Sequence, residues 1–191
     1  TGTQKGQVFY QSFNNPLFRQ RYPDHQYHMY VPNHYSAATP MGLMIWLHGG
    51  GSWSATDIDH LAQYDMDNDL VTRRSYARTE TDNSNYILVA PIAPFGPVIP
   101  HPQHASRWDV PDADQYLMDI ITEIAAKYNI DYNRVVIAGF SMGGIGAYHQ
   151  ALRLNDRLSA VMASAGSWSL GTWDGLKNMP MYLIHGVTDA Y

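Results

Sequence analysis

The residues whose types and spacing most clearly suggest chemistry are 139–143, with the sequence Gly-Phe-Ser-Met-Gly. A short apolar run rich in β-branched residues precedes them at 135–138 and predicts a buried strand, and residues 145–152 are compatible with a helix. A Gly-x-Ser-x-Gly sequence between a strand and a helix predicts a tight turn that exposes the serine hydroxyl as a nucleophile. Its two glycines have no side chains, which would otherwise collide with the neighbouring elements.

This turn could supply two parts of a nucleophilic catalyst. Ser141 would project its hydroxyl above the carboxyl edge of a parallel sheet, where the positive N-terminal end of the following helix favours negative charge. The backbone N–H of Met142 would then face a developing oxyanion. Gly-x-Ser-x-Gly also occurs by chance in many chains, but a readable strand before it and a helix after it favour the catalytic interpretation.

A second candidate stretch follows a near-continuous apolar run at 42–47, which is typical of a strand buried on both faces. His48 is followed there by three glycines, which would let the backbone of Gly50 and Gly51 approach a ligand and turn N–H groups towards it. We expect these two residues to complete an oxyanion hole, although a simple glycine-rich turn is the alternative for this stretch taken alone. His48 is expected to brace the loop through hydrogen bonds to backbone rather than to act as a base.

The elements that must position these residues alternate along the chain. Apolar residues at helical spacing predict a long amphipathic helix over 112–128, followed by a turn at 129–133. Together these features predict an α/β fold: a doubly wound, mostly parallel sheet with helices on both faces. Short runs predict two antiparallel edge strands, 8–10 and 27–31, and five buried strands, 42–47, 85–91, 135–138, 158–164 and 181–184.

Composition limits the classes of function. The chain has 191 residues, 45% hydrophobic and 15% charged, which predicts one globular domain over residues 1–191. A net charge of −5 and scattered basic residues argue against a nucleic-acid partner. No run approaches the length of a membrane span, and the absence of Cys excludes disulfides and cysteine nucleophiles. Many aromatic residues and few lysines suggest a secreted or periplasmic enzyme.

The remaining polar clusters do not predict a metal site or a cofactor. The aspartates between 57 and 69 do not reproduce the spacing of a calcium loop, and His101 and His104 lack a nearby Cys or carboxylate. The loop over 91–108 is rich in Pro, Gly and His and is expected to form a wall of a binding site. Core packing is the alternative for Trp108. The candidate substrate-lining residues are Trp53, His104, Trp108 and Trp168.

The order of these motifs resembles the α/β-hydrolase superfamily. The similar features are His48-Gly49-Gly50-Gly51 after a strand, the long helix, the turn at 139–143, and His185-Gly186-x-x-Asp189 after a late strand. Within the superfamily, the chain is most similar to the esterase branch that includes feruloyl and acetyl xylan esterases and polyhydroxybutyrate depolymerases. The resemblance runs from about residue 28 to the end. It implies a serine hydrolase that needs no cofactor.

The resemblance also implies a triad in the order serine, acid, histidine. Asp189 matches the acid, which would fix the tautomer of the histidine base, and a turn aspartate is the alternative. His185 matches a histidine at the strand end that is not the base. The base of the family follows the acid on a further loop, where this sequence has no histidine. We therefore expect the base, a final strand and a closing helix to lie in a missing C-terminal segment.

The expected function is cleavage of a carboxylic ester through an acyl-enzyme. The substrate would be a small-molecule or polysaccharide-linked ester, such as an acyl or feruloyl group on carbohydrate, with no nucleic-acid or membrane partner. Two alternatives stay open: a serine peptidase of the prolyl-oligopeptidase type, which shares the serine turn and the acid, and a non-catalytic binding module on a hydrolase scaffold. The sequence does not indicate an oligomeric state.

Overall fold

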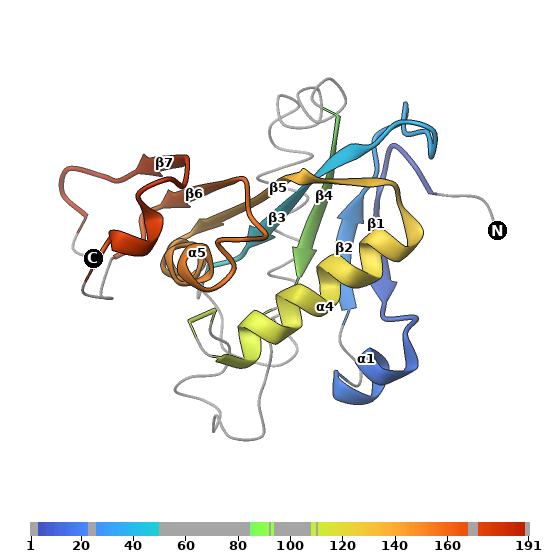
Figure 1. Ribbon diagram of the computed structural model, residues 1–191, viewed down its shortest axis with the longest axis horizontal. Helices are drawn as coiled ribbons and strands as arrows, with labels where there is room; N and C mark the ends of the chain where they lie inside the picture. The colour runs from blue at the N-terminus through green and yellow to red at the C-terminus, as the bar shows by residue number, and fades with distance from the viewer. Residues whose placement is uncertain are drawn as a thin grey trace.

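A seven-stranded sheet organises the protein in its computed structural model (Figure 1). The structure describes residues 4–22, 26–49, 85–91, 93, 108–109, 111–167 and 172–189. The strand order is β1-β2-β4-β3-β5-β6-β7. The strands are β1 (Val8–Ser12), β2 (Gln26–Tyr30), β3 (Met41–Leu47), β4 (Tyr86–Pro91), β5 (Ile130–Phe140), β6 (Ala160–Ser164) and β7 (Met181–Ile184).

Five of these strands are parallel, so their carboxyl ends lie along one edge of the sheet. β3 pairs with β4 on one side and with β5 on the other, and β6 and β7 follow β5 in parallel register. β1 and β2 form the predicted antiparallel edge, and β2 joins it to β4. The predicted α/β fold with a mostly parallel sheet is therefore confirmed.

The central strands are buried on both faces, as predicted for a parallel sheet. Leu43, Ile45 and Leu47 of β3 have no exposed surface and join the larger hydrophobic core. Trp46, between them, points to the opposite face and packs in a second cluster with Ala138 of β5. This alternation follows from the two-residue period of a strand.

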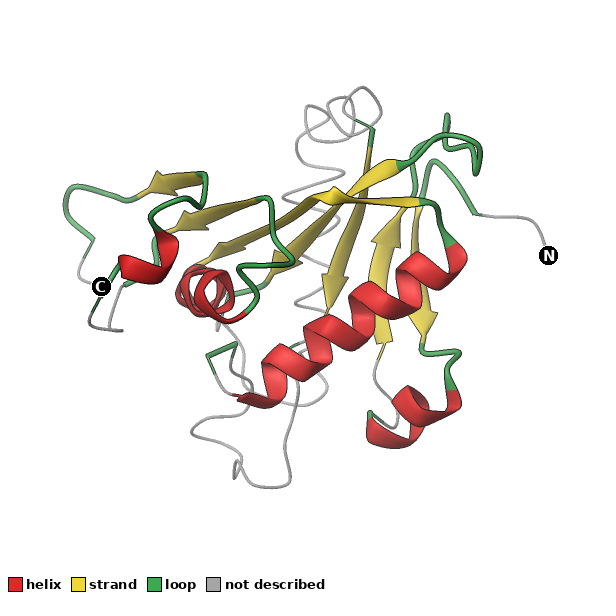
Figure 2. Ribbon diagram, viewed as in Figure 1, coloured by secondary structure: helices red, strands yellow, loops and turns green. Residues whose placement is uncertain are grey.

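Among the described elements, the helices α4 (Pro111–Lys127) and α5 (Met142–Arg153) cover one face of the sheet (Figures 1 and 2). α4 is the long helix predicted from the apolar spacing, and its Leu117, Ile120 and Ile124 are almost fully buried in the core. α5 follows β5 directly and packs against β3, β5 and β6. In the part of the chain that the structure describes, no helix is long and apolar enough to cross a membrane.

Residues 129–133 differ from the prediction of a turn. β5 already begins at Ile130, which is paired with Met41, but the next pair is Leu43 with Val135. The strand therefore contains an irregularity, in which the Asp131 carboxylate accepts hydrogen bonds from Asn133 N–H and Arg134 Nε. The predicted turn residues thus lie inside β5, at an interruption in its pairing with β3: the two strands are paired before this interruption and again after it.

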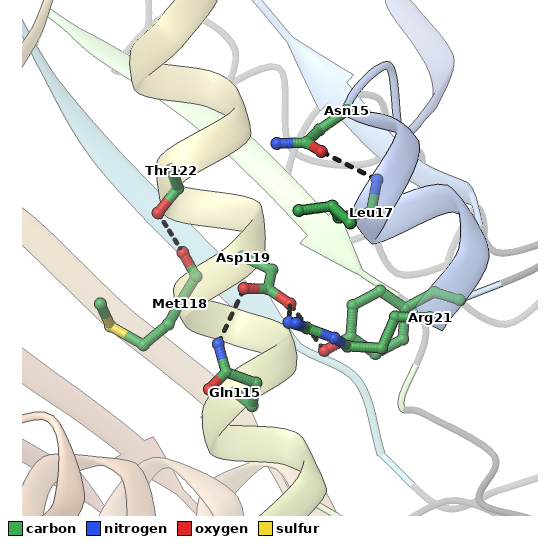
Figure 3. A network of polar contacts seen from close by, with 8 residues as sticks. Asn15, Leu17, Arg21, Gln115, Met118, Asp119 and Thr122 are labelled. Carbon is green, nitrogen blue, oxygen red and sulfur yellow. Dashed lines mark hydrogen bonds and ion pairs between the residues drawn. The ribbon is translucent and has the colours of Figure 1, made fainter.

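A short helix, α1 (Pro16–Arg21), was not predicted. Its N-cap is Asn15, whose side chain accepts the Leu17 N–H at 3.0 Å (Figure 3). Carboxylates of α4 fix the segment to the core. Glu123 accepts the backbone N–H groups that precede α1, and the buried Asp119 accepts hydrogen bonds from Arg21, from Gln115 and from the Tyr22 hydroxyl (Figure 3).

β7 was predicted to be a buried strand, and this prediction is wrong. Tyr182, Leu183 and Ile184 are 65%, 49% and 45% exposed. β7 pairs with β6 on one side only, and among the described residues no strand pairs with its other side. An apolar run of four residues therefore indicates a strand but does not tell an edge strand from a central one. A short 3-10 helix, η2 (Asp174–Leu176), precedes it.

Candidate active site

Ser141 stands at the turn between β5 and α5 in a strained backbone conformation. Its φ is 56° and its ψ is −118°, a region that residues with a side chain rarely adopt. The Ser141 N–H donates to the Ser164 carbonyl at 2.9 Å, and the Ser141 carbonyl accepts the first helical hydrogen bond from Ile145 N–H at 3.0 Å. The neighbouring strand and the helix thus hold a conformation that costs about 1–3 kcal/mol on its own.

The glycines of the turn are required by close packing. A Cβ atom at Gly139 would collide with the Gly143 carbonyl, and a Cβ atom at Gly143 would collide with the Leu47 carbonyl at the end of β3. The backbone of α5 therefore lies directly against two strands. This is the arrangement expected for Gly-x-Ser-x-Gly between a strand and a helix.

The N-terminal end of α5 faces the same edge of the sheet. Met142 is the first residue of the helix, so its N–H has no acceptor within the helix. The first helical turn carries no acidic residue that would compensate the positive end of the helix dipole. The local electrostatics at Ser141 therefore favour an anion.

Gly49 lies beside Ser141, at the end of β3. A Cβ atom at Gly49 would stand 3.5 Å from Ser141 Cβ and 3.4 Å from the Phe140 carbonyl oxygen. The start of the glycine stretch thus comes next to Ser141, because β3 and β5 are neighbours in the sheet. Gly50 and Gly51, predicted to donate to the oxyanion, lie outside the described residues, as does Trp53.

His48 braces this loop from inside the protein. Its side chain is buried, with Nδ1 2.8 Å from the Gly49 carbonyl oxygen and Nε2 3.0 Å from the Ala93 backbone nitrogen. Burial lowers the pKa of His48 to about 4, while the hydrogen bond to the Gly49 backbone opposes this shift. A neutral, buried ring that bonds to backbone agrees with the structural role expected for His48.

Trp108 lies in the core behind the loop rather than on an exposed wall. The ring has no exposed surface and meets the His48 ring edge-on, with 5.2 Å between the ring centroids. Its Nε1–H donates to the His48 carbonyl at 3.1 Å. Core packing, the alternative weighed for Trp108, therefore describes its placement. The other proposed lining residues, His104 and Trp168, lie outside the described residues.

Asp189 follows β7 at the carboxyl edge of the sheet. β7 is separated from β5 by β6 alone, and Ile184 at its end pairs with Ser164, whose carbonyl accepts the Ser141 N–H. Asp189 Oδ2 is 3.7 Å from His185 Nε2, and the carboxylate is partly exposed. The sheet order thus brings the proposed acid to the same edge as Ser141.

Among the described residues, no hydrogen bond joins the Ser141 hydroxyl to a histidine. His149 is buried within α5, and His34 Nε2 lies 2.6 Å from Asn85 Oδ1, on loops that precede β3 and β4. The described chain also contains no group of three or more His, Cys, Asp or Glu side chains that could hold a metal ion. The expectation that the base lies elsewhere stays a prediction.

Comparison with known sequences places the chain in a family. The sequence profile of the phospholipase/carboxylesterase family matches residues 36–191. The chain belongs to this family. A curated relative, the bifunctional acetylxylan esterase/xylanase XynS20E of Neocallimastix patriciarum, is 26% identical over 179 residues, which cover 92% of this chain and 23% of that protein. The chain thus spans about a quarter of this larger carboxylesterase relative.

Solved structures share the fold at low sequence identity. A mutant feruloyl esterase module from Clostridium thermocellum, in complex with sinapinate, gives a TM-score of 0.71 at 13% identity, over 96% of this chain and 68% of that one. A thermostable esterase gives 0.62 at 17% identity, over 92% and 45% of the two chains. The fluorophosphonate-binding serine hydrolase FphF of Staphylococcus aureus gives 0.57 at 14%, over 92% and 62%. These similarities show the α/β-hydrolase fold.

Two features of the candidate site could not be found from sequence. The Ser164 carbonyl accepts the Ser141 N–H, and Ala165 after it has a positive φ of 49°. Neither residue type signals such a role, since any residue can present a carbonyl and Ala rarely adopts this conformation. Gly166 is a sequence signal of close packing at this place, because its backbone lies against the backbone of Gly144.

Proposed function

We propose that the protein is a serine hydrolase that cleaves carboxylic esters through an acyl-enzyme. The observation that carries this proposal is the strained backbone of Ser141 between a parallel strand and the N-terminal end of α5. A strained nucleophile with a helix dipole behind it is suited to forming and stabilising an oxyanion. Membership of the phospholipase/carboxylesterase family supports an ester as the substrate.

The reaction would proceed in two halves. Ser141 Oγ attacks the ester carbonyl and transfers its proton to a histidine that the described residues do not include, and the N–H groups of Met142, Gly50 and Gly51 stabilise the oxyanion. The C–O bond to the alcohol breaks and the alcohol leaves with that proton. Water, activated by the same base, then releases the acid from Ser141. Asp189 would orient the histidine and stabilise its protonated form.

The proposed substrate class is an acetyl or feruloyl ester on carbohydrate. The acetylxylan esterase relative supports the carbohydrate part, and the fold shared with a feruloyl esterase module is compatible with an aromatic acyl group. Trp53, His104 and Trp168 are the proposed lining residues, and Trp108 is left out because its side chain is fully buried. A polysaccharide substrate agrees with a secreted or periplasmic location, which we also propose. The proposal of a single domain over residues 1–191 rests on the length and composition of the chain.

Labelling with a fluorophosphonate tests the nucleophile directly. We expect one adduct on the intact protein, mapping to Ser141, and none in Ser141→Ala. The same pair should differ by at least about 10³-fold in hydrolysis of p-nitrophenyl acetate. An unlabelled wild type with a folded circular dichroism spectrum would favour the non-catalytic binding module instead.

Substrate comparison separates the esterase from the peptidase alternative. The ratio of kcat/KM for acetylated xylan, methyl ferulate and a proline-terminated amide is the relevant quantity. We expect an ester to be cleaved far faster than the amide. A preference for the amide would support the prolyl-oligopeptidase-like alternative, which the named relatives do not favour.

A further inference from the structure

We propose that Phe140 is a specificity-determining residue for the alcohol part of the ester, and that its exposed ring packs against a cyclic, partly apolar group on the alcohol oxygen. This inference rests on the proposed function and adds to it a contact that selects the leaving group. Three observations support it: the place of the ring beside Ser141, the row of side chains that continues from it across the sheet, and the position of Asp189.

The Phe140 ring is exposed at the edge of the sheet where Ser141 stands. Phe140 is the last residue of β5 and is 49% exposed, whereas Ala138, two residues before it, has no exposed surface. A Cβ atom at Gly49 would stand 3.5 Å from Ser141 Cβ and 3.6 Å from Phe140 Cδ1. The edge of the ring and the serine Cβ therefore lie around the same point, and a group bound to Ser141 Oγ is close to the ring.

The ring belongs to the face of the sheet that α5 does not cover. Gly139 lies against Gly143 of α5, so Phe140, the next residue along the strand, points to the opposite face. That face carries the smaller hydrophobic cluster, to which Ala138 belongs. Phe140 therefore does not hold α5 on the sheet, and its exposed ring can contact a ligand instead.

A row of paired residues continues from Phe140 to the β7 edge. Phe140 pairs with Ser164, and Ser164 pairs with Ile184, so the three side chains share one face of the parallel sheet. Ile184 is 45% exposed, and Tyr182, on the same face of β7, is 65% exposed. Two strand spacings, about 10 Å, separate Phe140 from Ile184, with only a short serine side chain between them. Exposed apolar side chains gathered in this way are typical of a binding surface.

The position of Asp189 assigns this row to the alcohol rather than to the acyl group. The base that takes the proton from Ser141 Oγ must also give it to the alcohol oxygen, so the alcohol has to lie on the side of the base. Asp189, the proposed partner of the base, follows β7, and β6 and β7 both lie on one side of β5 in the sheet. The row from Phe140 to Ile184 runs in this direction, so the alcohol would lie over it.

Two pairs of esters separate the alcohol contact from an acyl contact. Ethyl acetate and cyclohexylmethyl acetate differ only in the alcohol, and both alcohols are primary, so they are similar leaving groups. Ethyl acetate and ethyl cyclohexylacetate differ only in the acyl group. The measured quantity is the ratio of kcat/KM within each pair, cyclic over acyclic, obtained by titration of the released acid. The cyclohexyl group has a six-membered ring like that of a sugar but no hydroxyl groups, so it reports on the apolar contact alone.

We expect Phe140→Ala to lower the alcohol ratio about tenfold and to change the acyl ratio by less than about twofold. Ile184→Ala, at the other end of the row, should lower the alcohol ratio about threefold. Tyr132→Ala is the matched control, since Tyr132 is a 62% exposed aromatic residue near the opposite end of β5. It should leave both ratios within about twofold of wild type.

The outcomes separate this inference from the proposed function. An acyl ratio that falls in Phe140→Ala while the alcohol ratio stays constant would overturn the assignment to the alcohol. Unchanged alcohol ratios in Phe140→Ala and Ile184→Ala, in a protein whose Ser141 takes the fluorophosphonate, would overturn this inference alone. A wild type that neither hydrolyses these esters nor takes the fluorophosphonate would overturn the proposed function as well.

A second variant covers the case in which Phe140→Ala does not fold. Ile184 lies on an edge strand and is 45% exposed, so its truncation should cost little stability. The alcohol ratio of Ile184→Ala then decides by itself: a fall of about threefold supports the row as the alcohol site, and no change overturns it.

Discussion

At the scale of the residue, Ser141 combines strain with its proposed chemical role. A φ of 56° is accessible to glycine at little cost but is strained for serine. Selection for nucleophilicity would therefore oppose stability at this position, as is common at active sites. Substitutions of Ser141 that all remove the hydroxyl can still differ in backbone strain, so the effect of the strain on stability can be measured separately.

We predict that Ser141→Gly is more stable than Ser141→Ala, although both are inactive. Glycine relieves about 1–3 kcal/mol of backbone strain and loses about 0.5–1 kcal/mol through the flexibility of the unfolded chain. The free energy of unfolding in urea should therefore be higher for Ser141→Gly by roughly 1 kcal/mol. Equal or lower stability of the glycine variant would show that the turn does not store strain at this residue.

His48 is expected to make the protein sensitive to acid. Its pKa is lowered to about 4 by burial, against 6.5 in the unfolded chain. Below pH 6.5 the unfolded state binds a proton that the folded state does not, so stability falls as the pH drops towards 4 and changes no further below it. The loss amounts to about 3 kcal/mol.

The free energy of unfolding measured between pH 7 and pH 4 tests this prediction. Acidic side chains also titrate in this window, so His48→Asn serves as the reference that lacks the imidazole. The difference between wild type and His48→Asn should shrink as the pH falls. A difference that stays constant would mean that His48 is not buried in its neutral form.

At the scale of the element, the contact between α5 and the sheet depends on the absence of side chains. We predict that Gly143→Ala destabilises the protein by about 1–3 kcal/mol, because its Cβ would collide with the backbone carbonyl of Leu47, which cannot move without disturbing β3. Gly186→Ala is the matched control. Its Cβ would find only an ordinary contact, 3.7 Å from Asp189 Cβ. Thermal unfolding of both variants should show a clear loss in Tm for Gly143→Ala alone.

The elements also show what sequence patterns can and cannot predict. The helix over 112–128 and the strands next to the glycine motifs were predictable, since their periodicity reflects burial against one neighbour. The turn at 129–133 and the burial of β7 were not, because both depend on which strands pair and where the sheet ends. α1 was missed because a six-residue helix carries almost no periodic signal.

The candidate site likewise has one part that the sequence predicts and another that it does not. The tight turn at Ser141 could be predicted, since a local motif specifies it. Neither the hydrogen bond between His48 and Ala93 nor the burial of Trp108 was contained in the motif, because both arise from contacts between distant parts of the chain. Residues 48 and 93 are 45 positions apart, and residues 48 and 108 are 60 apart.

At the scale of the whole molecule, the sheet is expected to be unequally stable from its centre to the β7 edge. β3 has paired neighbours on both sides and buried side chains on both faces, whereas β7 has one described neighbour and exposed side chains. Opening β7 exposes little new apolar surface, and opening β3 requires the core to unfold. Local stability should therefore follow strand position rather than strand composition, since both runs are apolar.

Hydrogen exchange and one pair of substitutions test this gradient. Backbone amides of β3 should exchange only through global unfolding, and those of β7 through local opening with a much lower free energy. Ile45→Ala, at a fully buried site, should cost about 2–5 kcal/mol of unfolding free energy, and Leu183→Ala, at a site that is 49% exposed, less than about 1 kcal/mol. Equal costs, or equal protection of the two strands, would mean that β7 is covered in solution by something that buries its apolar side chains.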